Sequence, residues 1–89
     1  MSSKKEIKDL FTAELLNTNQ YQIILAIKQL ILTDISIPNI QAQVLYNFET
    51  PQTDYDIEVI KMCMIIEFGF STNNISSNCI IINMADFLN

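Results

Sequence analysis

Apolar residues recur at helical spacing in the first third of the chain, in two groups that a polar stretch separates. The first group is Ile7, Leu10, Phe11 and Leu15, and the second is Ile23, Ile24, Ile27, Leu30 and Ile31. Spacings of three and four residues place each group on one side of a helix. The polar stretch at residues 17–20 predicts a break or bend between them. We therefore expect two helical stretches, the second with a wide apolar face.

A third helical segment is predicted at residues 38–49. Pro38 suits the first turn of a helix, where its missing amide has no partner to lose. The apolar positions on one face of this segment are Ile40, Val44, Leu45 and Phe48. Pro51 disfavours helical geometry at the residue before it and ends the segment. The first fifty residues are thus expected to form an N-terminal helical hairpin.

Apolar and other residues alternate without interruption from residue 60 to residue 70. The alternating positions are Ile60, Met62, Met64, Ile66, Phe68 and Phe70. A period of two is typical of a strand. The Ser- and Asn-rich stretch at 71–78 predicts a loop, and the isoleucine-rich run at 79–83 predicts a second strand. The sequence therefore predicts an α+β protein, with a helical segment at residues 1–50 and a β-hairpin at residues 51–89.

Residues 54–58 (DYDIE) form the densest acidic patch. A calcium loop here lacks the glycine and the distal glutamate that such loops use to bind the ion. A mimic of nucleic acid is a second alternative. We interpret the patch as the solvated start of a strand or helix, which requires no ligand.

The apolar content is high for so short a chain. Hydrophobic residues make up 49% of the 89 residues, and a domain of this size buries only a modest share of its surface. An excess of apolar side chains favours a partner subunit that completes the core. A compact monomer is the alternative. The predicted hairpin, which is marginal by itself, also favours a partner.

The charge is distributed unevenly. There are ten acidic residues and five lysines, and the formal net charge is −5. Three of the lysines, Lys4, Lys5 and Lys8, lie in the first eight residues. An acidic surface repels phosphate, so contact with DNA is expected only from these lysines or from another chain. A winged helix is disfavoured, because residues 36–49, its recognition helix, contain no cation.

Residue types that carry out common chemistry are few. The chain has no histidine, one glycine and two well-separated cysteines. The sequence therefore lacks an imidazole base, a glycine-rich phosphate loop and the usual zinc-ligand spacing. We expect Cys63 and Cys79 to be buried reduced thiols of an intracellular protein, and we expect no catalytic residue, metal or cofactor. The longest apolar run, residues 23–27, is too short to span a membrane, so no membrane partner is expected.

Three stretches resemble the small (gamma) subunit of transcription factor IIA in their order and spacing. Residues 30–49 are similar to the junction between that family's two helices. The matching residues there are Leu30, Ile31, Pro38, Ile40, Gln43, Val44, Leu45, Phe48 and Glu49. Residues 64–70 resemble the family's first strand, and residues 75–87 resemble its next strand.

The resemblance implies a non-catalytic subunit of a general transcription initiation factor for RNA polymerase II, located in the nucleus. The helical hairpin is then half of a four-helix bundle formed with a large subunit, and the strands contribute to a shared β-barrel. This heterodimer adds a strand edge to TATA-binding protein and stabilises it on promoter DNA. The chain meets DNA only within that complex.

The resemblance also assigns residues to these contacts. The interface with the partner subunit comprises Ile23, Ile27, Leu30, Ile31, Ile40, Val44, Leu45, Phe48, Met64, Ile66, Phe68, Ile80 and Ile82. The contact with TATA-binding protein falls on Asn73, Asn74 and Ile75, where this chain lacks the family's aromatic and basic residues.

A second class of function fits the charge. A small acidic inhibitor, such as a toxin-immunity protein or a phage anti-defence protein, masks a basic partner, and the acidic patch at 54–58 suits that role. This reading explains neither the apolar excess nor the matched spacing. An enzyme is the third and least favoured class.

Overall fold

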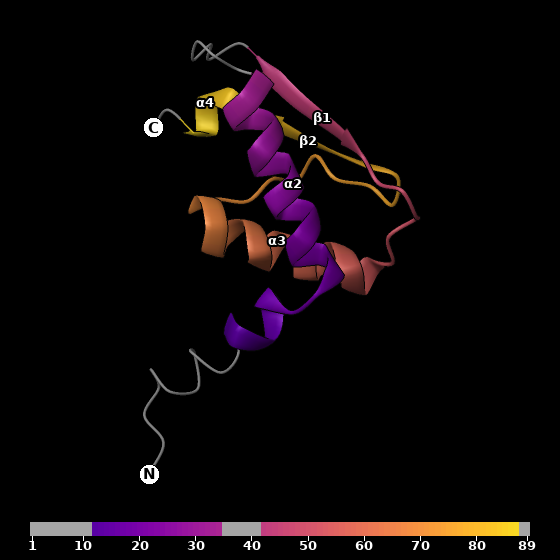
Figure 1. Cartoon of the computed structure of the whole chain (residues 1–89). Coiled ribbons are helices and arrows are strands. Elements are labelled where there is room, and N and C mark those ends of the chain that lie inside the picture. Colours follow the sequence, from indigo (N-terminus) through magenta and orange to yellow (C-terminus); the bar gives the residue numbers. More distant parts are fainter. Residues whose placement is uncertain (1–11, 35–41, 88–89) are drawn as a thin grey trace.

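The computed structural model describes residues 12–34 and 42–87. A helical turn at residues 12–16 is followed by α2 (Asn19–Asp34), β1 (Gln43–Asn47), α3 (Asp54–Phe68), β2 (Cys79–Asn83) and α4 (Met84–Phe87). The described part of the chain is thus a small α+β domain, as predicted, and its two antiparallel strands do not close into a barrel. Figure 1 shows α2 running past both α3 and the sheet.

The predicted break between the two helical stretches is confirmed, and so is the second helix. Thr18 makes the break: its hydroxyl donates to the carbonyl of Leu15 (2.6 Å) and accepts the amide of Tyr21 (3.1 Å). One side chain thus ends the turn at 12–16 and caps α2. The buried face of α2 consists of Tyr21, Ile24, Ile27 and Ile31. The beginning of the first helical stretch lies outside the described residues.

The predicted third helix is wrong, because residues 43–47 form strand β1. Val44 and Tyr46 are half-buried, while Leu45 and the two end residues are exposed. β-Branched and aromatic residues fit this half-buried pleated surface. Pairing with β2 favours a strand over a helix at these residues, since the backbone amides and carbonyls of β2 need hydrogen-bonding partners. Ile40, which was expected on the helix face, lies outside the described residues.

The predicted strand at residues 60–70 is also wrong, because helix α3 occupies most of that stretch. Thr53 caps the helix: its hydroxyl accepts the amide of Asp56 (3.1 Å), and the carboxylate of Asp56 accepts the amide of Thr53 (3.1 Å). This reciprocal pair is a capping box. The acidic patch at 54–58 is therefore the start of a helix, where carboxylates stabilise the positive end of the helix dipole.

The end of α3 is equally well defined. Gly69 has a φ of 82°, in the left-handed region, and its amide donates to the carbonyl of Ile65 (2.9 Å). The side chains that α3 buries are Val59, Ile60, Cys63 and Met64, which share one helical face. Ile66, counted with Ile60 in the alternation, is exposed, because six residues of helix rotate a side chain by about 600°.

Strand β2, predicted at residues 79–83, is confirmed, but its partner is β1. The two strands pair over all five residues, so the predicted hairpin with residues 60–70 is wrong, and α3 lies in the connection between the strands. The described residues before and after residue 50 each include one long helix and one strand. The division of the chain at residue 50 stays a prediction.

The predicted loop before β2 covers the second edge of that strand. Ile75 forms an isolated bridge with Ile80, and the amide of Ile81 donates to the carbonyl of Asn74 (2.8 Å). Cys79, expected to be buried, is only partly so, because it lies on the outer face of the sheet.

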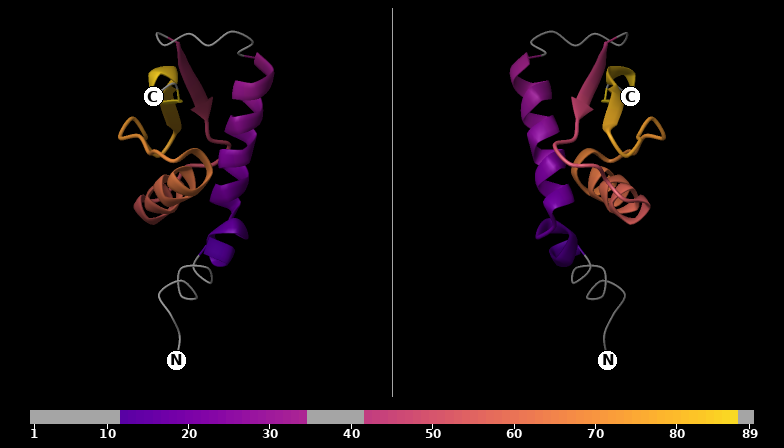
Figure 2. Two further views of the ribbon diagram at one scale, coloured as in Figure 1. Left: turned by 90° about the vertical axis from the view of Figure 1, so that its left-hand side faces the viewer. Right: turned by 90° about the vertical axis from the view of Figure 1, so that its right-hand side faces the viewer.

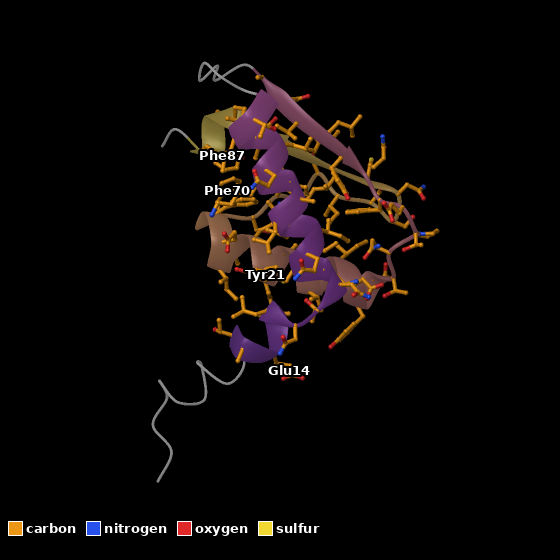
Figure 3. All side chains as sticks on the ribbon, viewed as in Figure 1. Glu14, Tyr21, Phe70 and Phe87 are labelled. Atoms are coloured by element: carbon orange, nitrogen blue, oxygen red, sulfur yellow. The ribbon has the colours of Figure 1, made fainter. Side chains whose placement is uncertain are left out.

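The core lies where α2, α3 and the inner face of β2 meet. Its fully buried large side chains are Ile24, Ile27, Ile60, Met64, Ile80, Ile82 and Cys63. The side views of Figure 2 show α2 on one side of the sheet, with α3 below β2. A smaller aromatic cluster of Phe68, Phe70 and Phe87 joins the end of α3 to α4, with ring centroids 4.8 to 5.8 Å apart (Figure 3).

Candidate functional site

Twelve of the thirteen predicted partner-interface residues fall into three groups in the structure, and Ile40 lies outside the described residues. Five are buried in the chain's own core: Ile27, Ile31, Met64, Ile80 and Ile82. Four are partly buried against that core: Ile23, Val44, Phe48 and Phe68. Three are exposed: Leu30, Leu45 and Ile66. The single chain thus packs most of the predicted interface itself, and only the exposed group is fully available to a partner.

Further exposed apolar residues were not among the predicted interface residues. Tyr55 is 77% exposed, Leu32 66% and Ile65 55%, and Leu16 is also exposed. Ile65 was missed because residues 60–70 were predicted to be a strand, in which it lies on the opposite face from Ile66. The Thr53 cap and the Gly69 stop were the signals that identify a helix and so place Ile65 beside Ile66 on its outer side.

The predicted TATA-binding-protein contact lies in the loop that flanks β2. Asn73 and Asn74 are exposed, and Ile75 is half-buried at the bridge to Ile80. The hydroxyl of Thr72 accepts the amide of Asn74 (3.0 Å) and donates to the carbonyl of Ile81 (3.2 Å). The backbone of this loop is therefore engaged with β2, and of the three predicted contact residues only the two asparagines are exposed.

A charged and hydrogen-bonded cluster joins α2 to the end of α3. The hydroxyl of Tyr21 donates to one carboxylate oxygen of Glu67, and the ammonium of Lys28 lies 2.7 Å from the other. Tyr21 is buried in the core, and Figure 3 shows it between the two helices. Both oxygens of Glu67 are thus occupied, which makes the cluster an interhelical tie.

The pKa values in this region follow from these contacts. The hydrogen bond to Glu67 and burial raise the pKa of Tyr21 to about 12. The hydrogen bonds from Lys28 and Tyr21 hold the pKa of Glu67 below its usual value. Burial raises the pKa of the Cys63 thiol, which keeps it protonated and unreactive. The contacts of Tyr21 and Glu67 therefore stabilise the packing of α2 on α3. Neither these two groups nor the Cys63 thiol is available as a free base.

A polar cavity of about 600 Å³ lies between the first half of α2 and the connection from β1 to α3. Its lining consists of Asn19, Gln20, Gln22, Ile23, Ala26, Tyr46, Glu49, Thr50, Pro51, Gln52 and Asp56. Side-chain amides dominate, and the two charged groups are carboxylates. Ile23 was predicted as a partner-interface residue, but no cavity was predicted here, since the lining residues are distant in sequence and meet only through the fold.

Gln52 fixes one wall of the cavity. Its side-chain amide nitrogen donates one hydrogen bond to the carbonyl of Thr50 (2.9 Å), and its side-chain oxygen accepts one from the side-chain amide of Gln20 (3.2 Å). Its backbone amide donates to the carbonyl of Ser77 (2.8 Å). Gln52 is buried and fully engaged. The exposed Glu49 gives the cavity a negative charge that is not committed to a helix cap, so the cavity suits a cationic or hydrogen-bond-donating group.

Two negative findings concern residues 12–34 and 42–87. In these ranges, no group of three or more potential metal ligands is placed to hold an ion. No helix there has the length and apolar character needed to cross a membrane.

Comparison with known proteins gives no match: no family model matches the chain, and no curated protein or solved structure does so.

Proposed function

We propose that this chain is a non-catalytic subunit that acts by binding another protein. The observation that carries the proposal is the surface: Leu32, Leu45 and Ile65 are each more than half exposed, although the chain has a closed core of its own. Single exposed apolar residues are common on monomers, but here they occur on both long helices and on the sheet of a domain of 89 residues. Contiguous exposed apolar surface is typical of interaction sites, and on α3 the neighbouring residues Ile65 and Ile66 are both exposed.

The specific partners proposed are those implied by the resemblance to transcription factor IIA. They are a large subunit of that factor, which would share a four-helix bundle and a β-barrel with this chain, and TATA-binding protein on promoter DNA in the nucleus. The matched order and spacing in residues 30–49 support this proposal. The elements that it expects there and at residues 64–70 differ from β1 and α3, so the general binding function is argued from the exposed apolar residues and not from this resemblance.

A second candidate is a small acidic inhibitor of a basic protein. The amide- and carboxylate-lined cavity favours it, because none of its lining residues is a cation and Glu49 is exposed at its rim. A lysine or arginine side chain of a partner would find hydrogen-bond acceptors and a negative charge there.

Purification of the tagged full chain, with mass spectrometry of the proteins it retains, tests these proposals. A large subunit of transcription factor IIA supports the first partner set, and a reconstituted mixture should then slow dissociation of TATA-binding protein from DNA in gel shifts. A basic toxin or nuclease supports the inhibitor. Recovery of no stoichiometric partner contradicts the binding function.

Matched variants locate the surface. Ile65→Lys should abolish capture in the first case, because it places a charge on the exposed apolar side of α3. Glu49→Lys should abolish capture of a basic partner, whereas Glu14→Lys, at an exposed position in the turn at 12–16, is the control for charge alone. A retained complex in both Ile65→Lys and Glu49→Lys would place the binding surface elsewhere.

A further inference from the structure

The pairing of β1 with β2 fixes which backbone groups of β1 point outward. The amide of Phe48 donates to the carbonyl of Asn78 (2.9 Å), and the amide of Met84 donates to the carbonyl of Ala42 (3.0 Å). Opposed residues of antiparallel strands alternate between hydrogen-bonded and non-hydrogen-bonded pairs. The even-numbered residues of β1 therefore bond to β2. The residues whose amides and carbonyls point away from β2 are Gln43, Leu45 and Asn47.

These outward groups have no hydrogen-bond partner within the described ranges, 12–34 and 42–87. The far edge of β2 is different, because the amide of Ile81 donates to Asn74 (2.8 Å) and the carbonyl of Cys79 accepts the amide of Ser76 (2.9 Å). The described sheet thus has one covered edge and one open edge. Figure 1 shows β1 along the rim of the molecule.

The open edge lacks the features that usually prevent strand addition. Natural edge strands are protected by charged side chains, proline or a bulge. Residues 42–48 contain no charged residue and no proline, and β1 pairs with β2 in unbroken register. An exposed leucine, Leu45, lies at the centre of the strand.

We propose that a second copy of this chain pairs antiparallel with the outer edge of β1, with a two-fold axis at Leu45. In this register Leu45 lies opposite Leu45 of the partner subunit, and Gln43 lies opposite Asn47 of the partner subunit. All three outward residues of each copy then form hydrogen-bonded pairs, which exchange two bonds each. The two sheets become one continuous four-stranded sheet with an isologous interface.

The side chains of β1 favour a second copy over an unrelated strand. The sequence QVLYN has amides at both ends and a leucine in the middle, so its outer face is complementary to itself when reversed. Leucine meets leucine, amide meets amide, and no like charges are opposed. The edge offers no charge by which a different strand would be selected. Leu45 is also one of the exposed residues on which the proposed binding function rests. The pairing is tested with the chain alone, so its outcome is separate from capture of a heterologous partner, which is tested at Ile65.

Light scattering after size exclusion, with the full chain at concentrations from about 0.01 to 1 mM, tests the dimer. The interface is small, and small interfaces are weak, so the measured mass should rise from 10.2 kDa toward twice that value over this range. Leu45→Pro should remain a monomer, because proline lacks the outward amide while the amide lost is not used by β2. Leu32→Lys, which adds a charge at an exposed leucine of α2, is the control and should dimerise normally.

A charge exchange tests the two-fold register. Leu45→Lys should weaken the dimer at least roughly fivefold, because it opposes two like charges across the axis. Leu45→Glu should do the same, and a mixture of the two variants should form a heterodimer. Heterodimerisation at the wild-type level or above confirms the axis at residue 45.

Amide hydrogen exchange is a second measurement, which needs no variant. Exchange at Gln43, Leu45 and Asn47 should slow as the concentration rises, whereas exchange at Val44 and Tyr46 should not change. A wild-type chain that stays monomeric at 1 mM overturns the proposal. So does a dimer that Leu45→Pro leaves intact, or one in which protection appears at α3 instead of β1.

Discussion

Helix α3 and strand β2 are both apolar runs in the second half of the chain, yet one is helical and the other extended. The difference lies in side-chain type and in the flanking residues. β2 contains three consecutive isoleucines, which favour strands. The middle of α3 contains two methionines, which favour helices. Apolar alternation alone does not separate the two, because a helix with an extensive apolar surface also places apolar residues at every second position.

The flanking residues separate them clearly. Thr53 and Asp56 close a capping box before α3, and Gly69 ends it in the left-handed region. β2 has no helix-capping residues at its ends; it follows a loop and leads directly into α4. Start and stop signals therefore carry more information here than the period of the apolar residues between them.

The largest expected effect tests the periodicity of the two elements. Ile60→Ala should lower the free energy of unfolding by about 2–5 kcal/mol, because the side chain is fully buried, whereas Ile66→Ala should cost less than about 1 kcal/mol. In β2, Ile80→Ala and Ile82→Ala should both be costly. Urea unfolding monitored by circular dichroism measures all four. Equal losses at Ile60 and Ile66 would indicate a strand at α3.

The next effect tests the end of α3. Gly69→Ala should destabilise the protein by about 1–2 kcal/mol, because a side chain is disfavoured at a φ of 82°. A Cβ atom at this position would meet nothing within 4 Å, so the cost is conformational and not steric. Gly69→Asn is the control and should cost less, since asparagine tolerates this conformation. An alanine variant as stable as wild type would contradict the assigned cap.

The start of α3 is tested by its capping box. Thr53→Ala should lower the free energy of unfolding by about 0.5–2 kcal/mol, because the amide of Asp56 loses its acceptor. Thr53→Ser keeps the hydroxyl and should retain most of the stability. Thermal unfolding of the three proteins at one concentration provides the comparison. Equal losses for alanine and serine would show that the hydroxyl is not the cause.

The smallest expected effect concerns the tie between α2 and α3 and its dependence on pH. Glu67 has a lowered pKa in the folded state, so its contribution is present above the unfolded-state pKa and is lost as pH falls through the folded value. Glu67→Gln should therefore flatten the loss of stability in acid. Unfolding midpoints of both proteins from pH 7 down to about pH 3 measure how steeply stability falls with pH. The same slope in Glu67→Gln and wild type would refute the prediction.

The same tie gives a signal in alkali. The pKa of Tyr21 is raised to about 12, so its contribution is complete below the unfolded-state value near 10 and is lost as pH rises through the folded value. Absorbance at the phenolate band should show a late-titrating component. Tyr21→Phe should remove it, and its persistence in that variant would assign it to another tyrosine.

The sequence alone determined the α+β class, the helix α2 with a break before it in residues 17–20, and the strand β2. These are elements whose local signals agree: helical spacing and a polar cap in one case, consecutive β-branched residues after a turn-forming stretch in the other. The interface prediction was less informative, because most of its apolar residues are buried in the chain's own core or packed against it.

The tertiary structure decided the rest. The apolar spacing of β1 predicts a helix. As a strand, however, it pairs with β2 and supplies hydrogen-bond partners for the backbone amides and carbonyls of β2. The cavity and the tie at Glu67 likewise join residues that lie far apart in the sequence. The open edge of β1 depends on which edge of the sheet is covered. Local propensity cannot encode these features, because each depends on which distant segment the chain brings alongside.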